Sequence, residues 1–311
     1  MNRTEYSAAA EAYIAAMPSL KMSAQTIRAY KMILGKFGDY LAEQNSDEIN
    51  ALATVGFRVW LFGKKLKTNT VAHYMTVLHG FFEWARRVKL LSGDNPVALE
   101  EIPKGEQITY DHLALNEIEQ TLSTLPKGIY KKSYCRNRAI VLLLIQAGLR
   151  NSELRDLTLA DLDFERNVVT VRHGKGDKFR EAPFPALARE AMTDYLKSGF
   201  RPADAADTDV LFGSYADENG RGAQNSTWHK MSSPMLLGLV KRYVKHVTGH
   251  TGIGTHDLRH AFASYASDKG VSTRNISLCM GHSNEMITNK TYISVLDRGR
   301  AATCVNAALG A

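Results

Sequence analysis

The sequence predicts a chain of two mainly α domains, the second of which carries a small β-hairpin or sheet. Three observations lead to this fold class. Apolar residues recur every three or four positions over long segments, one pair of segments has strand character, and helix-breaking residues cluster at positions 92–96. With 311 residues, 44% of them hydrophobic, the chain is long enough to form two hydrophobic cores.

The N-terminal domain, residues 1–104, is expected to be a helical bundle. Ser23 is a suitable N-cap, and apolar residues follow it at helical spacing from Ile27 to Leu41. Further amphipathic segments end before the breaker cluster Ser92-Gly93-Asp94-Asn95-Pro96. The expected helices cover residues 23–41, 51–62 and 68–85.

Residues 97–111 show no periodicity and include Pro103 and Gly105, so we expect them to form an interdomain linker. The second domain, residues 112–311, begins with helix-compatible sequence. Its apolar run before Gly148 predicts a helix buried on all sides, and this glycine is expected to end it in a left-handed conformation. The expected helices cover residues 116–120, 138–147, 186–197, 234–247, 255–270, 273–280 and 284–295.

The strand-like segments are 168–172 and 178–183, and they flank the glycine-containing turn 173–177. No other part of the chain shows a clear strand pattern. We therefore expect a β-hairpin within an otherwise helical second domain.

Composition excludes several classes of protein. No stretch approaches the roughly 18 uncharged apolar residues of a membrane span, and the N-terminus lacks the apolar region of a secretory signal. Three scattered cysteines give no disulfide framework. The net charge of +7 and the pI near 9.2 mildly favour an anionic partner such as nucleic acid. A soluble, cytoplasmic protein is expected.

Six polar residues stand at positions that hydrophobic pattern alone does not explain. Arg150 follows the buried helix, Lys175 lies between two glycines of the hairpin turn, and His256 and Arg259 share one face of a helix. His282 follows a Met-Gly cap, and Tyr292 lies about three helical turns further on. Taken singly, each has an ordinary structural explanation, such as a surface charge, a turn residue or a core tyrosine.

A zinc site is an alternative use of some of these residues. His256 and His260 are four residues apart on one helix, and Cys279 and His282 are close to each other in sequence. However, no HExxH or CxxC motif accompanies them, so we expect no metal. His260 is expected to support the site, and Cys279 to be a small buried apolar residue.

Taken together, these residues and their order resemble the tyrosine recombinase (phage integrase, Xer-like) family. The segments AGLRNSELRDL, VRHGKGDKFREAPF, THDLRHAFASYA and MGHSN are similar to the family's boxes. The bundle that closes in Asp94-Asn95-Pro96 is similar to the family's N-terminal core-binding (SAM-like) domain, so the resemblance covers nearly the whole chain. It identifies the second domain as the family's catalytic domain.

The resemblance implies site-specific cutting and rejoining of DNA strands without metal or cofactor. Arg150 and Arg259 would hold the scissile phosphate, because planar guanidiniums donate paired hydrogen bonds to its oxygens. Tyr292 would be the nucleophile, and a phenol with a pKa near 10 needs help to lose its proton. His256 would act as the general base, Lys175 would protonate the leaving 5′ oxygen, and His282 would donate a hydrogen bond to the phosphate.

One departure from the family pattern concerns the interval between His282 and Tyr292, which is one residue longer than usual. Tyr292 is nevertheless the only candidate nucleophile, since no other tyrosine follows Tyr265. The loop 283–285 could absorb the additional residue. The longer interval supports an alternative function, in which the chain is a catalytically inactive DNA-binding relative. Type IB topoisomerase-like strand relaxation is a second alternative.

The family resemblance also implies partners. Double-stranded DNA would lie between the two domains, and the C-terminal tail would dock onto a neighbouring subunit in a homotetramer on two DNA sites. Accessory DNA-bending proteins are possible partners, whereas a membrane is not. The enzyme would act in the cytoplasm at the nucleoid. The candidate phosphate contacts of the first domain are Lys64, Lys65, Lys67, Arg86 and Arg87.

The biological task could be integration and excision of a mobile element, inversion of a DNA segment, or resolution of chromosome dimers, which share one chemistry. The segment from Tyr6 to Met17 is too short for an additional arm-binding domain. This favours a simple recombinase over a two-site integrase.

Overall fold

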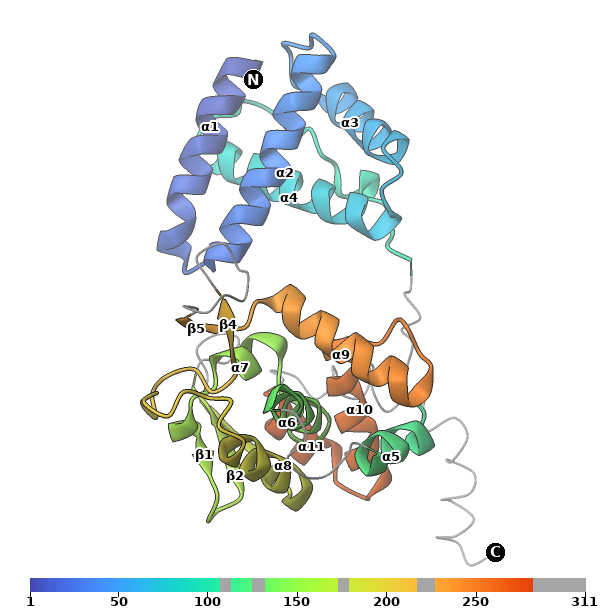
Figure 1. Ribbon diagram of the computed structural model, residues 1–311. Helices are drawn as coiled ribbons and strands as arrows, with labels where there is room; N and C mark the ends of the chain where they lie inside the picture. Colours follow the sequence, from blue (N-terminus) through green and yellow to red (C-terminus); the bar gives the residue numbers. More distant parts are fainter. Residues whose placement is uncertain (107–112, 125–131, 173–178, 217–226, 282–311) are drawn as a thin grey trace, which may run out of the picture. The chain divides into compact units, whose positions relative to one another are not determined.

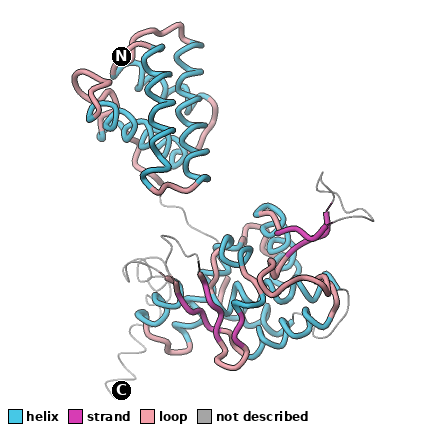
Figure 2. The backbone as a smooth tube through the Cα atoms, turned by 90° about the vertical axis from the view of Figure 1, so that its left-hand side faces the viewer, coloured by secondary structure: helices cyan, strands magenta, loops and turns pink. Residues whose placement is uncertain are grey.

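A computed structural model of the chain shows two compact units, Met1–Thr109 and Tyr110–Ala311 (Figure 1). The structure describes all residues except 107–112, 125–131, 173–178, 217–226 and 282–311. Both units are mainly helical, and the strands belong to the second unit (Figure 2). The expected fold class is therefore confirmed.

The first unit is built from four α-helices. α1 spans Arg3–Ala16, α2 Ala24–Glu43, α3 Ala51–Gly63 and α4 Thr68–Arg87, and short 3₁₀ helices cover Met17–Leu20 and Leu99–Glu101. The three expected helices are confirmed as α2, α3 and α4. The hydroxyl oxygen of Ser23 accepts a hydrogen bond from the backbone N–H of Thr26 at 3.1 Å, which makes Ser23 the N-cap of α2.

Helix α1 was not among the expected helices, because alanines occupy much of its length and its apolar face is short. Asn2 and Glu5 form a capping box at its start. Tyr6, Ala9 and Tyr13 are buried, and the Tyr6 hydroxyl donates a hydrogen bond to the carbonyl oxygen of Leu34 at 2.7 Å. These contacts place α1 in the core of the first unit.

The predicted linker is partly bound to the first unit. Val97 is fully buried, and Ile102 packs against the core of that unit. Arg58 of α3 forms an ion pair with Glu101, and Thr68 donates a hydrogen bond to the Glu106 carboxylate at 2.7 Å. Residues 97–106 are thus part of the first unit rather than a free connection, and 107–111 lie outside the described residues.

The second unit surrounds a central buried helix. α6, Lys132–Ala147, is seen nearly end-on in Figure 1 and contacts the helices α7, α8, α9 and α10 and the strand β3. Its residues Ala139–Ile145 are fully buried, as expected from the continuous apolar run. The other helices are α5 Leu115–Thr124, α7 Asn151–Asp156, α8 Ala186–Lys197, α9 Ser233–Thr248, α10 Thr255–Asp268, α11 Thr273–Met280 and a short 3₁₀ helix Leu159–Asp161.

The expected hairpin strands are present as β2, Val168–Val171, and β3, Arg180–Pro183, which pair antiparallel with Val171 opposite Arg180. A two-residue strand β1, Leu162–Asp163, adds to the other edge of β2. β4, Gly213–Ala216, and β5, Thr227–Lys230, form a separate two-stranded sheet. β1 is too short to give a sequence pattern, and β4 and β5 lack a run of β-branched residues, so the expectation of a single hairpin was wrong in this respect.

Within the parts of the chain that the structure describes, no helix has the length and apolar character needed to cross a membrane. The expected helix 284–295 lies outside the described residues.

Candidate active site

Arg150 lies in the sharp connection between the buried helix α6 and the short helix α7. Gly148 has φ +61° and so ends α6 in the left-handed conformation that was expected. A Cβ at this glycine would overlap the Phe262 ring of α10, so only glycine allows the two elements to approach this closely. Arg150 is the N-cap of α7, and its side chain is 25% exposed.

A buried carboxylate, Glu153, binds the Arg150 guanidinium. Its Oε1 accepts a hydrogen bond from Arg150 Nη1 at 2.7 Å, and its Oε2 accepts one from the Arg150 backbone N–H at 2.7 Å. Arg180 Nη2 donates to the same Oε2 at 2.6 Å, and Arg259 Nη1 lies 3.8 Å from it. The Glu153 side chain is 1% exposed. Three arginines from three different elements therefore meet at one carboxylate.

Arg259 is buried, at 1% exposure, in the first half of α10. Its Nη1 donates to the carbonyl oxygen of Gly148, and its Nη2 donates to that of Met280 at 2.5 Å. These bonds tie α10 to the end of α6 and to the end of α11. A guanidinium has five N–H donors, which allows Arg259 to bond to both carbonyl oxygens while it also lies near Glu153.

His256 lies one helical turn before Arg259 on α10 and is exposed to solvent. The ring of His260 packs edge-on against it, with ring centroids 4.6 Å apart. Desolvation by the surrounding protein and the positive charges of Arg259 and Arg150 lower the pKa of His256, against the opposing effect of Asp257. The imidazole is therefore held in its neutral form, the form that a general base requires.

The C-terminal end of α11 forms another wall of the site. Gly281 has φ +63°, and its carbonyl oxygen accepts a hydrogen bond from Arg150 Nη2 at 3.1 Å. Arg180 Nη1 donates to the carbonyl oxygen of Cys279. Burial raises the pKa of the Cys279 thiol, with Arg180 opposing it, and the side chain is half-buried rather than fully buried as expected.

Burial and the neighbouring arginines shift the pKa of Glu153 in opposite directions. Burial alone would raise the pKa of this carboxyl, but Arg180 and the hydrogen bonds and charge of Arg150 outweigh it, so the pKa lies below its usual range. Burial lowers the pKa of Arg180, and Glu153 opposes that effect. The cluster is thus a charged network of one carboxylate and its arginines.

The structure brings together Arg150, His256 and Arg259 of the six candidate catalytic residues. Lys175, His282 and Tyr292 lie outside the described residues. Arg180, which follows the Lys175 turn, and Gly281, which precedes His282, both belong to the described cluster.

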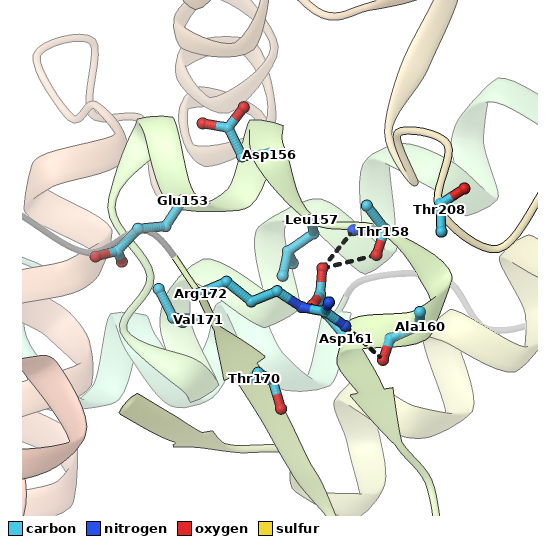
Figure 3. A pocket seen from close by; sticks show the side chains of 10 residues that line it. All are labelled: Glu153, Asp156, Leu157, Thr158, Ala160, Asp161, Thr170, Val171, Arg172 and Thr208. Atoms are coloured by element: carbon cyan, nitrogen blue, oxygen red, sulfur yellow. Dashed lines mark hydrogen bonds and ion pairs between the residues drawn. The ribbon is translucent and has the colours of Figure 1, made fainter. Parts of the chain in front are cut away.

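A pocket of about 470 Å³ lies beside this cluster, between α7 and β2 (Figure 3). Arg172 extends across it, and its Nε donates to Asp161 Oδ1 at 2.5 Å. Asp161 Oδ2 also accepts hydrogen bonds from the backbone N–H and the hydroxyl of Thr158. These partners fix the end of β2, where the hairpin turn begins, and we assign no ligand to the pocket.

Among the residues that the structure describes, no three His, Cys, Asp or Glu side chains are grouped so that they could hold a metal ion. The rings of His256 and His260 are in contact on α10, whereas Cys279 lies on a different helix, α11. His282, the fourth residue of the zinc alternative, lies outside the described residues.

The five candidate phosphate contacts of the first unit fall into two groups. Lys64, Lys65 and Lys67 lie between α3 and α4, where the Lys64 ammonium sits over the Trp60 ring at 4.7 Å. Arg86 and Arg87 end α4, and Arg86 pairs with Glu83 at 3.1 Å. Since α4 has 20 residues, about 30 Å of helix separates the groups, so they do not form one continuous patch.

Two residues of the site were not recognised from sequence. Glu153 lies in the same box as Arg150 at an i, i+3 spacing that is typical of a capping box, and that spacing could have identified it. Arg180 has the sequence context of an ordinary strand residue. Its burial against α11, which is far away in the sequence, cannot be recognised from neighbouring residues.

The chain is similar to known proteins over most of its length. The profile of the phage integrase family matches residues 111–298, and that of the phage integrase N-terminal SAM-like domain matches residues 11–89. The chain is 30% identical over 267 residues to the tyrosine recombinase XerC of Bacillus pumilus, covering 84% of this chain and 83% of the relative. It is 29% identical over 277 residues to XerC of Staphylococcus aureus, covering 88% and 87%.

Solved structures share the fold. The XerH site-specific recombinase bound to a palindromic difH substrate, in a post-cleavage complex, has a TM-score of 0.69 at 21% identity, covering 91% of this chain and 79% of that one. The Tn1549 transposon integrase in complex with circular intermediate DNA has a TM-score of 0.67 at 23% identity, covering 94% and 95%.

Proposed function

Because the chain belongs to the phage integrase family and is a tyrosine site-specific recombinase, we propose that it cuts DNA strands through a 3′-phosphotyrosyl intermediate and rejoins them to new partners. The observation that carries this proposal is the meeting of Arg150 and Arg259 at Glu153. Two guanidiniums fixed at one place, one of them partly open to solvent, suit a phosphodiester whose transition state gains negative charge.

In the proposed mechanism Tyr292 attacks the scissile phosphate, and its oxygen forms a bond to phosphorus as the bond to the 5′ oxygen breaks. His256, whose lowered pKa keeps the imidazole neutral, takes the phenolic proton. Lys175 gives a proton to the departing 5′ oxygen, and His282 donates a hydrogen bond to a nonbridging oxygen. Attack by the 5′ hydroxyl of another strand reverses these steps, so no metal or external energy source is required.

The two units have separate parts in this proposal. The first, with a SAM-like profile match, contacts the DNA backbone through the lysines between α3 and α4 and the arginines that end α4. The second, residues 112–311 in our division, carries out the chemistry. We propose that four copies assemble on two DNA sites, that DNA-bending proteins assist, and that the enzyme acts in the cytoplasm at the nucleoid.

The relatives reported above are recombinases and an integrase, and they lend no support to a topoisomerase-like or an inactive DNA-binding function. Integration and excision, inversion, and dimer resolution would use the same residues, so the proposal covers all three tasks.

Covalent trapping tests the proposal. Duplexes that tile the DNA flanking the chain's own gene, each with a nick near the candidate crossover, are incubated with the protein without metal and quenched with detergent. The nick lets a short fragment diffuse away, so that the cleaved state accumulates. We expect a protein–DNA adduct with the wild type and none with Tyr292→Phe. Binding without any adduct would contradict the proposal and favour the inactive relative.

A further inference from the structure

Arg180, the first residue of β3, contacts α7, which begins after Arg150, and α11, which ends just before His282. Its guanidinium donates to Glu153 Oε2 at 2.6 Å and to the carbonyl oxygen of Cys279. The side chain is only 7% exposed. Glu153 is in the first turn of α7 after Arg150, and Cys279 is in the last turn of α11.

The turn that ends α11 is shaped around this side chain. A Cβ on Gly281 would come within 2.7 Å of Arg180 Cδ and 3.0 Å of its Nε. The Gly281 carbonyl in turn accepts the hydrogen bond from Arg150 Nη2 at 3.1 Å. Arg180 therefore touches both partners of the Arg150 guanidinium, the Glu153 carboxylate and the Gly281 turn.

The negative charge of buried Glu153 makes the position of Arg150 depend on Arg180. Both oxygens of Glu153 are buried and engaged, and among the described residues Arg180 and Arg150 are its closest cationic partners. A buried carboxylate that loses a cation must either recruit another cation or take up a proton. Both outcomes change the position of Arg150, because the Glu153 carboxylate accepts hydrogen bonds from the backbone N–H and from Nη1 of Arg150.

We propose that Arg180 is a positioning residue for strand cleavage, which holds the Arg150 guanidinium at the scissile phosphate by fixing Glu153 and the Gly281 turn. The inference rests on the proposed function. Arg180 itself does not contact the DNA in this proposal, so its loss affects the rate of cleavage rather than the affinity for DNA.

The matched control is Arg166, which pairs with Glu181 of the same sheet at 2.8 Å but is 62% exposed. Arg180→Gln, Arg180→Lys and Arg166→Gln are compared with the wild type in full-length form. The measurements are DNA affinity, midpoint of thermal unfolding, and the single-turnover rate of adduct formation on the nicked duplex.

We expect Arg180→Gln to bind DNA as the wild type does and to form adduct about 10- to 100-fold more slowly, the size of effect that a displaced catalytic group produces. Arg180→Lys keeps a charge beside Glu153 and is expected to recover part of the rate. Arg166→Gln is expected to react at the wild-type rate.

A pH profile separates positioning from a general loss of structure. Loss of Arg180 removes the largest pKa-lowering influence on Glu153, so the carboxyl takes up a proton at a higher pH than in the wild type and then releases Arg150. The rate of Arg180→Gln relative to wild type is therefore expected to fall further as the pH is lowered. The same ratio for Arg166→Gln is expected to stay constant.

The inference is overturned if Arg180→Gln cleaves as fast as Arg166→Gln. It is also overturned if a stably folded Arg180→Lys is no faster than Arg180→Gln and the relative rate does not change with pH. If the glutamine variant unfolds, Arg180→Lys is compared with Arg166→Gln, and equal rates of these two variants at every pH overturn the inference. A wild type that forms no adduct contradicts the proposed function itself and removes this inference with it.

Discussion

At the scale of single residues, the charge state of His256 follows from its neighbours. Desolvation lowers the pKa of the imidazole, and so do the charges of Arg259, which is on the same helix, and of Arg150, which is bonded to the Gly281 carbonyl oxygen. In the proposed mechanism, the arginines that would bind the phosphate thus also keep the general base neutral. This is the protonation state that removal of a proton from Tyr292 needs.

We expect adduct formation by the wild type to be constant above about pH 6.5 and to decline below it, as His256 takes up a proton. The lowered pKa places this decline on the acid side of the usual histidine value. His256→Gln is expected to be about 10²- to 10³-fold slower and to lack the decline. The measurement is the single-turnover rate across pH.

His250→Gln is the matched control, because His250 pairs with Glu117 at 2.8 Å in the same unit but outside the site. It is expected to keep the wild-type profile. An acid decline that persists unchanged in His256→Gln would mean that another group titrates.

The sequence indicated the candidate catalytic residues and their order but not the contacts that they make. Arg150 and Arg259 were identified from their boxes, whereas the burial of Arg259 against Gly148 and Met280 depends on packing between distant elements. Glu153 was missed because a glutamate near a helix start is commonly an exposed capping residue. Its role becomes evident only when Arg180 is placed beside it.

At the scale of elements, Gly270 and Gly281 are two of the left-handed glycines that follow helices of the second unit, and their surroundings differ. Gly270 has φ +83° and follows α10, and a Cβ there would meet no atom within 4 Å. Gly281 has φ +63°, and its Cβ would overlap the Arg180 side chain. An alanine at position 270 would therefore introduce backbone strain alone, whereas an alanine at position 281 would also collide with the Arg180 side chain.

We expect Gly270→Ala to lower the free energy of unfolding by about 1 kcal/mol, the cost of a left-handed alanine. Gly281→Ala is expected to cost about 1–3 kcal/mol more through overpacking and to slow adduct formation as well. Denaturant unfolding and the cleavage assay measure the two effects. Equal stability and equal activity of the two variants would contradict the account of the Gly281 turn.

Element boundaries were well predicted wherever hydrophobic periodicity was long. The apolar residues expected on α4 are all buried, from Val71 to Ala85, and α8 begins and ends where the sequence indicated. Periodicity failed for α1, whose buried face rests on Tyr6, Ala9 and Tyr13 among alanines. It also failed for β4 and β5, whose sequences Gly213–Ala216 and Thr227–Lys230 lack the run of β-branched residues that marked β2.

At the scale of the whole molecule, DNA affinity is expected to be shared between units and to depend on salt. Substituting Lys64, Lys65 and Lys67 together by Gln should reduce the slope of log affinity against log salt by up to about 3, roughly 0.9 for each phosphate that is no longer neutralised. Substituting Arg86 and Arg87 should produce a smaller and independent reduction, because these residues lie at the other end of α4. Fluorescence anisotropy at several salt concentrations measures both slopes.

If neither set of substitutions changes the slope, the first unit does not bind phosphates through these residues. A variant that carries both sets of substitutions is expected to show the sum of the two reductions in slope, since groups this far apart share no partner.

The central claim is that Tyr292 becomes joined to the 3′ phosphate of the cleaved strand. It is tested most directly by isolating the covalent adduct, digesting it with nuclease and trypsin, and locating the attached nucleotide by mass spectrometry. Cleavage after Lys290 and Arg298 releases a peptide in which Tyr292 is the sole tyrosine. We predict that the nucleotide is found on this peptide. A nucleotide attached to any other peptide would contradict the account.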